Sequence, residues 1–229
     1  GHLPLFLGER ILQESTDSSL RDSAVQTLCV TCASMGDEQK ALHYAEMGGS
    51  FYSTKESLKT FALTGEAGVR ACQEHLVSLL LEASMTAVQM TADAAFTPAE
   101  EIQAYQFGVD LFHLLFSDGN VGSYANELST LCLRIAQKYA ELADAPKTLE
   151  YLEQSARYAV AESAAVKAPF TAFLVNRLEN NPALWSKNYK GNACNLRLAA
   201  LSWEGYDFIR DSDVFRKIQS TLKNHAENL

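Results

Sequence analysis

Apolar residues recur at three- and four-residue intervals along most of this chain, which is the spacing of an amphipathic α-helix. Runs of valine, isoleucine and threonine, which favour strands, are scarce, and only five prolines interrupt the pattern. Polar clusters and glycines divide it into segments. The pattern predicts an all-α protein with helices over residues 3–14, 19–35, 37–47, 53–62, 66–92, 97–116, 122–143, 146–161, 192–201 and 213–225.

Two predicted helices carry clear start signals. Thr97-Pro98-Ala99-Glu100 combines a capping threonine, a proline at the first helical position and a glutamate in the first turn. Ser53-Thr54-Lys55-Glu56 has the S-x-x-E form of a capping box. The region 169–229 is less regular, and within it residues 176–191 are either a long aromatic-bearing loop or a short helix with a loop.

Aromatic residues are assigned to packing. One predicted helix carries a dense apolar stripe, for which we expect burial, made of Phe107, Leu111, Phe112, Leu114, Leu115 and Phe116. Trp185 and Trp203 are also expected in the core rather than in a binding site.

The chain partly repeats itself at an offset of 107 residues. ASMGDEQKALHYAE at 33–46 lies over AELADAPKTLEYLE at 140–153, and six of the 14 positions are identical. Both segments join a longer helix to a second helix through a very short turn. Such self-similarity indicates a helical repeat protein.

The two copies, at about 22–53 and 129–160, resemble tetratricopeptide repeats. The repeat skeleton falls on Val25, Leu28, Cys29, Cys32, Ala41, Ala45 and Ser53 in the first copy, and on Cys132, Ile135, Ala136, Tyr139, Thr148, Leu152 and Val160 in the second. Ala143 stands where the family usually has glycine. The resemblance implies one domain over 1–229, built as a right-handed superhelix of antiparallel helix pairs.

The motif Cys29-Val30-Thr31-Cys32 has three possible interpretations: packing, metal binding or redox chemistry. Cysteines three residues apart share one helix face, where free cysteine behaves as a small hydrophobe. A zinc site needs further ligands, and the other suggestive pair is Cys72 with His75. A redox cysteine would be expected at a helix N-terminus, whereas Cys29 is predicted inside its helix. Packing is the favoured interpretation, and we expect no metal and no cofactor.

Charge and composition narrow the choice of partner. The chain is 47% hydrophobic and carries a net charge of −9, so direct binding to nucleic acid is disfavoured. No apolar run reaches the roughly 18 residues of a membrane span. The odd number of cysteines, five, indicates reduced thiols and a cytoplasmic protein.

Three blocks beyond the repeats carry a second resemblance: residues 8–46, the pair FLVNRLENN and SKNYKGN, and YDFIRDSDVFRKI. Together they resemble the C-terminal region of XRE-class helix-turn-helix transcriptional regulators of Gram-positive bacteria. The resemblance implies a sensor and self-association region, a protein or peptide partner, and a homodimer. It also implies a DNA-binding domain N-terminal to this segment, through which alone nucleic acid is bound. The alternative is a free-standing tetratricopeptide adaptor.

Candidate binding residues lie in two places. The first helix of each repeat pair lines the groove of such arrays, which selects Gln26, Val30, Ala33, Leu133 and Gln137. The second place is a locally basic, amide-rich loop with Arg177, Lys187, Asn188, Tyr189 and Asn192, which could hold a peptide or instead be a solvated connection whose asparagines cap turns.

Motifs for catalysis are missing from the sequence. It has no phosphate-binding glycine loop, no H-E-x-x-H and no G-x-S-x-G. His43, His75 and His113 have no carboxylate or nucleophile at motif spacing. We therefore expect a recognition protein rather than an enzyme.

Overall fold

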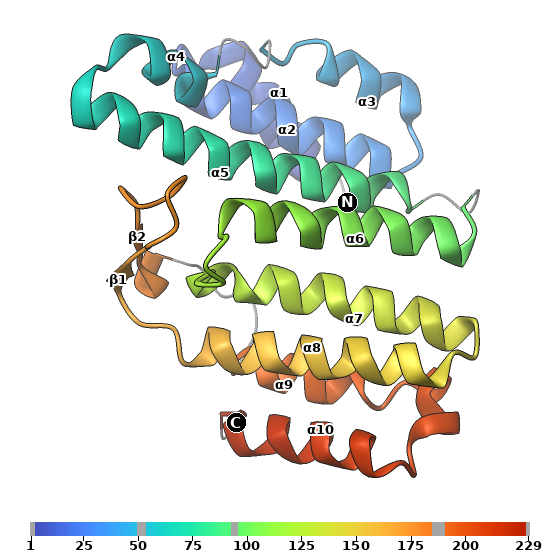
Figure 1. The fold of residues 1–229 in the computed structure, drawn as a ribbon. Coiled ribbons are helices and arrows are strands. Elements are labelled where there is room, and N and C mark those ends of the chain that lie inside the picture. The colour runs from blue at the N-terminus through green and yellow to red at the C-terminus, as the bar shows by residue number, and fades with distance from the viewer. Residues whose placement is uncertain (1–2, 50–53, 93–95, 185–190, 228–229) are drawn as a thin grey trace. The chain divides into compact units, whose positions relative to one another are not determined.

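The computed structural model describes residues 3–49, 54–92, 96–184 and 191–227. The chain divides into two compact units, residues 1–62 and 63–229. The first contains α1 (Leu3–Glu14), α2 (Ser18–Ser34), α3 (Glu38–Ala45) and α4 (Lys55–Ala62) (Figure 1). The second contains α5 (Gly65–Met90), α6 (Pro98–Leu115), α7 (Ala125–Glu141), α8 (Ala145–Ser163), β1 (Ala168–Pro169), β2 (Glu179–Asn180), α9 (Ala193–Ala200) and α10 (Asp213–His225), with short 3-10 helices at Gly122–Tyr124, Pro182–Leu184 and Glu204–Ile209.

The prediction of an all-α protein is confirmed, and the predicted helices match the observed ones to within a few residues. A small antiparallel pairing that the pattern did not predict lies at the start of the irregular region, with Ala168 opposite Asn180 and Pro169 opposite Glu179. The single-domain organisation and the right-handed superhelix stay predictions.

Capping explains where the helices begin. Thr97 and Glu100 form the predicted capping box, in which the Glu100 carboxylate accepts a hydrogen bond from the Thr97 backbone N–H at 2.8 Å. The Ser53 end of the other predicted box lies outside the described residues. There the Thr54 hydroxyl accepts from the Ser57 N–H at 3.3 Å, next to the start of α4.

The 107-residue repeat is visible in the backbone. α2 and α7 both have 17 residues, and both are followed by the same tight turn into the next helix. Asp37 and Asp144 cap α3 and α8, each accepting from the N–H three residues later. Each is preceded by a left-handed residue, Gly36 with φ 77° and Ala143 with φ 55°. The α2–α3 hairpin of the first unit and the α7–α8 hairpin of the second therefore share one turn geometry.

The first unit has a small core between α1, α2 and α3, formed by Leu28, Cys32, Ala41 and Tyr44 with Leu5, Leu12 and Cys29 packed against them. α1 approaches closely because Gly8 faces Leu28, where an added Cβ would lie 2.7 Å from the leucine Cγ. Cys32 is buried and Cys29 half-buried in this core, as the packing interpretation predicts.

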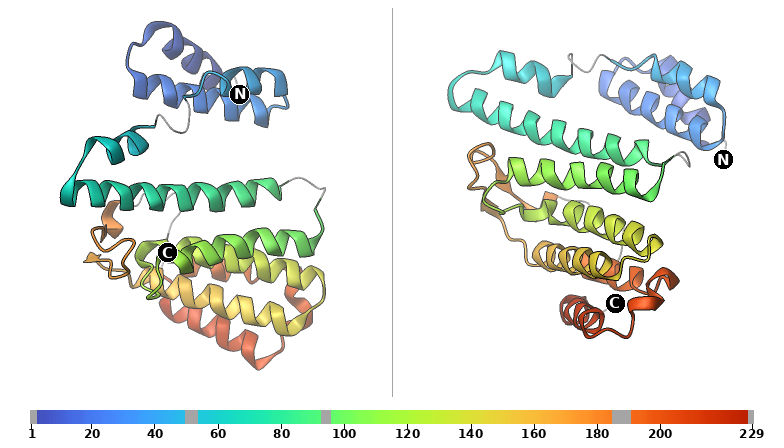
Figure 2. Two further views of the ribbon diagram at one scale, coloured as in Figure 1. Left: turned by 45° about the horizontal axis from the view of Figure 1, so that its top comes forward. Right: turned by 45° about the vertical axis from the view of Figure 1, so that its right-hand side comes forward.

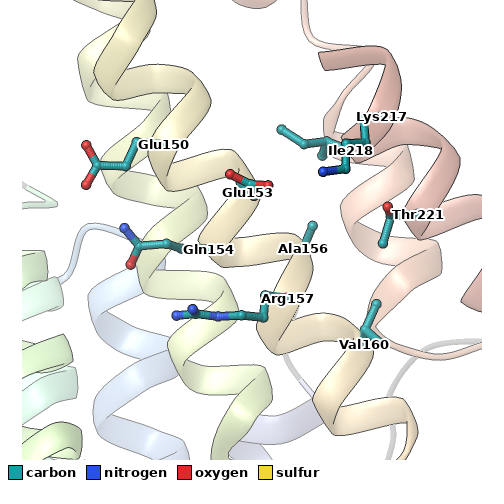
Figure 3. Close-up of a pocket in the computed structure, with 9 residues that line it drawn as sticks. All are labelled: Glu150, Glu153, Gln154, Ala156, Arg157, Val160, Lys217, Ile218 and Thr221. Atoms are coloured by element: carbon teal, nitrogen blue, oxygen red, sulfur yellow. The ribbon is translucent and has the colours of Figure 1, made fainter. Parts of the chain in front are cut away.

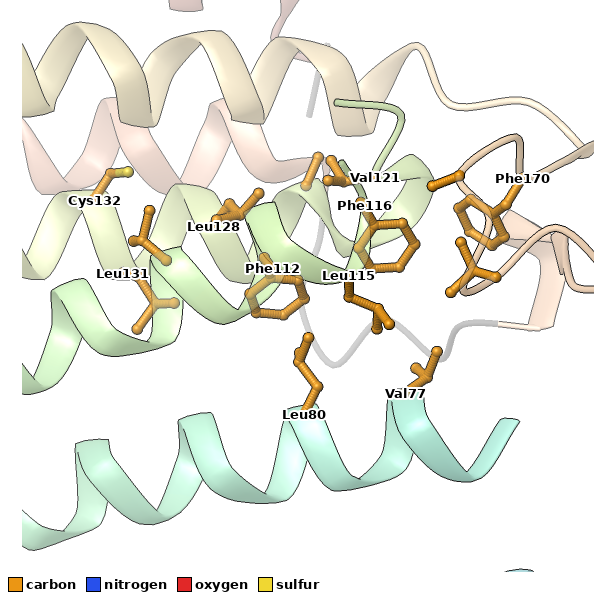
Figure 4. Packing of buried hydrophobic residues seen from close by; sticks show 14 of the residues in the cluster. Val77, Leu80, Phe112, Leu115, Phe116, Val121, Leu128, Leu131, Cys132 and Phe170 are labelled. Atoms are coloured by element: carbon orange, nitrogen blue, oxygen red, sulfur yellow. The ribbon is translucent and has the colours of Figure 1, made fainter. Parts of the chain in front are cut away.

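In the second unit α5, α6, α7 and α8 lie side by side in chain order (Figures 1 and 2). The main core fills the space between α5, α6 and α7 and extends to Phe170, whose ring lies 5.2 Å from that of Phe116 (Figure 4). A second cluster joins α7 and α8 to α9 and α10. Trp203 packs against it, edge-on to Tyr206, as predicted for a core residue. Trp185 lies outside the described residues.

The aromatic stripe is only partly buried. Phe112, Leu115 and Phe116 belong to the core, but Phe107 is 47% and Leu114 71% exposed, so the prediction of burial is wrong for these two. α6 lies between α5 and α7, and these two neighbours leave Phe107 and Leu114 uncovered. The apolar residues of α6 therefore extend around the helix beyond the surface that its neighbours bury.

Candidate functional site

A hollow of about 720 Å³ opens on the α2–α3 hairpin of the first unit. α2, the end of α3 with the residues that follow it, and the beginning of α4 surround it. It is lined by Ser18, Ser19, Asp22, Val25, Gln26, Cys29, Val30, Ala45, Gly48, Gly49, Thr54, Lys55 and Glu56. α2 contributes because Leu28 and Cys32 turn to the core, which leaves its opposite face to solvent.

Two of the predicted groove residues, Gln26 and Val30, line this hollow, and both are exposed. Val30 is 61% exposed, so its side chain is accessible to a binding partner. Ala33 is exposed on the same helix but does not line the hollow. The sequence pattern therefore selected the free face of α2.

The hollow has an apolar floor with carboxylates at its edge. Val25 and Cys29 are half-buried in the floor, and Asp22 and Glu56 are exposed. The Asp22 carboxylate makes no hydrogen bond or ion pair with any residue that the structure describes. Lys55 supplies the cation of the lining. Such a surface suits an amphipathic polypeptide better than an anion.

The second copy of the hairpin is covered. Leu133 and Gln137, predicted to line a groove, are half-buried on α7, and Leu133 packs against the cluster shared with α8, α9 and α10. α9 lies on this hairpin and its Arg197 is only 6% exposed. The guanidinium donates to the Ser129 hydroxyl at 2.7 Å and to the Thr130 hydroxyl at 2.6 Å.

Two candidate residues of the basic loop, Arg177 and Asn192, lie in the described part of the chain, and both hold neighbouring elements in place. Arg177 donates to the Glu66 carboxylate at 2.7 Å, and its backbone N–H donates to the Gln73 side chain. Asn192 is 4% exposed, caps α9 and donates to the His225 carbonyl at 2.8 Å. This is the capping role that the sequence left open as an alternative to binding. Lys187, Asn188 and Tyr189 lie outside the described residues.

A second groove, of about 430 Å³, separates α8 from α10 and was not predicted. Figure 3 shows Glu153 and Lys217 extending into it from opposite helices. Ala156 and Ile218, which also line the groove, are buried. No ion pair joins these two charges. Arg157 lies instead over the Tyr158 ring, 5.1 Å from its centroid. The sequence could not reveal this groove because α8 and α10 are separated by an irregular region.

Thiol chemistry is not favoured at the buried cysteines. Burial raises the pKa of Cys132 to about 12, although Arg157 and Arg197 lower it in part. Burial also raises the pKa of Cys194. Both thiols are therefore protonated at neutral pH. Within the described ranges, no group of three histidine, cysteine, aspartate or glutamate side chains is arranged to hold a metal ion.

Comparison of the chain with protein-family models, with curated proteins and with solved structures gives no match. Among the helices that the structure describes, none has both the length and the apolar character needed to cross a membrane.

Proposed function

We propose that this chain is a recognition and self-association region that acts without catalysis as the sensor part of a cytoplasmic XRE-class transcriptional regulator. It would be built as a tetratricopeptide-like superhelix. The repeated hairpin supports the repeat character. The observation that carries the proposal is the hollow on α2, because Gln26 and Val30, selected from the repeat pattern, both line it.

The mechanism follows from the hairpin architecture. A protein or peptide that binds the hollow contacts α2 and α4 together, so it favours the arrangement of these helices that fits it best. In a dimer such a shift would change the spacing of two attached DNA-binding domains, and operator half-sites are read at fixed spacing. The net charge of −9 is consistent with DNA binding through a separate domain.

The test uses the full coding sequence of the gene. Val30→Asp places a charge in the lining of the hollow. Because Val30 is already 61% exposed, folding should be unaffected. Val214→Asp, at a residue 42% exposed and outside both hollows, is the matched control. We expect V30D alone to change sedimentation, partner capture by cross-linking, or operator binding in a mobility-shift assay. A V30D protein equal to wild type in all three assays would rule the proposal out.

The α8–α10 groove supports one alternative, a free-standing adaptor that holds two partners at separate hollows. The two functions differ in the full-length protein. A helix-turn-helix domain in the translated gene, together with operator binding, selects the regulator. Partner capture through both hollows, without any DNA-binding domain, selects the adaptor.

A further inference from the structure

The internal repeat relates the open hollow of the first unit to the place that α9 occupies in the second. Five residues that line the hollow each have a counterpart 107 positions later, in the α7–α8 hairpin. On the occupied hairpin they are Asn126, Ser129, Ala136, Leu152 and Ala156, and on the open hairpin they are Ser19, Asp22, Cys29, Ala45 and Gly49. The latter five all line the hollow. The same surface is therefore covered by a helix in one copy, whereas in the other no described helix lies on it.

The covered copy shows how a helix is held there. Ala136, Leu152 and Ala156 belong to one buried cluster that contains Ala193 and Cys194 of α9 and also Ile218 and Leu222 of α10. At the polar edge the α9 cation Arg197 donates to Ser129, and also to the side-chain oxygen of Asn126 at 3.2 Å. The arrangement is thus an apolar contact along the hairpin and a cation at one end.

The open copy has the same arrangement of an apolar surface with a polar edge, but its apolar residues are smaller and its edge carries a carboxylate. Ala45 and Gly49 replace a leucine and an alanine, so the apolar floor is wider. Asp22 replaces the serine that receives the arginine of α9. A carboxylate binds a guanidinium or ammonium group more strongly than a hydroxyl does. Asp22 has no partner among the described residues, and Glu56 adds a second carboxylate to the lining.

We propose that the hollow on α2 and α3 receives a short amphipathic helix of a partner polypeptide, with an arginine or lysine on its docked face next to Asp22. This inference rests on the proposed function and names the occupant of its site. The lining residues on α2 run from Ser18 to Val30, about 18 Å along the helix axis at 1.5 Å per residue. That length holds about three turns of helix, whereas an extended strand covers it with about five or six residues.

The probe is a fluorescent helical peptide with the sequence of residues 192–201 in which Asn195→Lys and Ala199→Glu, at positions that are not buried, are joined by a side-chain lactam. It is titrated into the full chain and followed by anisotropy. The bridge is needed because such short helices are marginal in water. We expect saturable binding that Asp22→Arg weakens about tenfold or more, as for a close charge pair across an interface. A peptide with glutamate at the position of Arg197 should bind the D22R chain better than it binds the native chain.

Glu38→Arg, the matched control, makes the same charge change at an exposed position outside the hollow, and should leave binding unchanged. Absence of binding overturns the inference, as does binding that D22R does not weaken, because the peptide would then have displaced α9 or bound elsewhere. Equal binding by a proline-substituted, non-helical peptide overturns it in favour of an extended ligand. If the probe fails while V30D still changes assembly or partner capture, the helix is wrong and the proposed function stands.

Discussion

The left-handed residue in the second hairpin turn offers a sharp test of the repeat. Ala143 adopts φ 55°, a conformation in which its Cβ approaches the following carbonyl oxygen. Its counterpart in the first hairpin is Gly36, with φ 77° and no such conflict. We predict that Ala143→Gly stabilises the protein and that Gly36→Ala destabilises it.

The magnitude follows from two opposing effects. The left-handed conformation costs a residue with a Cβ about 1–2 kcal/mol. Glycine makes the unfolded chain more flexible, which costs about 0.4–1 kcal/mol of stability. The net gain for A143G is therefore about 0.5–1 kcal/mol, and the loss for G36A is similar. No atom lies within 4 Å of a Cβ built on Gly36, so contact with neighbours adds nothing to the second value.

Thermal unfolding followed by circular dichroism measures both changes. For a chain of this length, about 0.5–1 kcal/mol corresponds to a shift of about 1–4 °C in Tm. Urea unfolding should show the same signs at unchanged slope m. A lower Tm for A143G, as expected for glycine in a helix interior, would refute the reasoning, and so would shifts of equal sign in the two variants.

Three further predictions concern the second unit. Tyr206→Phe should raise the free energy of unfolding by about 1 kcal/mol in urea titrations, because the buried Tyr206 hydroxyl has no hydrogen-bond partner among the described residues. Asn192→Ala should lower it by about 2 kcal/mol, since the α9 cap and the bond to His225 are both lost; an unchanged value would return Asn192 to the binding candidates. Lys138 and Glu101 pair at 2.9 Å between α7 and α6, and a double-mutant cycle of Lys138→Met with Glu101→Gln should give a coupling of about 1 kcal/mol. Burial opposes the charge of Lys138, but hydrogen bonds to two carboxylates outweigh it and raise its pKa. The Lys138 contribution should therefore be complete below about pH 10.4, the unfolded pKa, and be lost as the pH rises through the folded pKa; a pH dependence unchanged in K138M would contradict this.

The helices could be predicted from the sequence because their signals are local. The Thr97 capping box and the apolar periodicity both act within a few residues, so a single sequence displays them. The 107-residue offset also predicted the two matching hairpins. The stripe on α6 shows the limit of the method, since the periodicity gives the apolar side chains but not how much of the helix its neighbours cover.

The site could be predicted only in part. Gln26 and Val30 were selected because one helix face packs inward, which leaves the other face free. The loop residue Arg177 could not be assigned, because its fixed position depends on Gln73, 104 residues away. Glu153 and Lys217 face each other only through the packing of α8 and α10. Contacts of this range have no signature in a single sequence.

The five cysteines range from exposed to buried, so they can serve as native probes of local unfolding. Cys72 is exposed on α5, whereas Cys132 and Cys194 are buried in the same unit with raised pKa values. An alkylating reagent should therefore modify Cys72 at once and reach the other two only when the packing around α7 and α9 opens transiently. The time course of labelling at each thiol, read by mass spectrometry, thus reports the opening free energy of that packing in the native protein. No dye, tag or substitution is needed, because the reporters are already in the core.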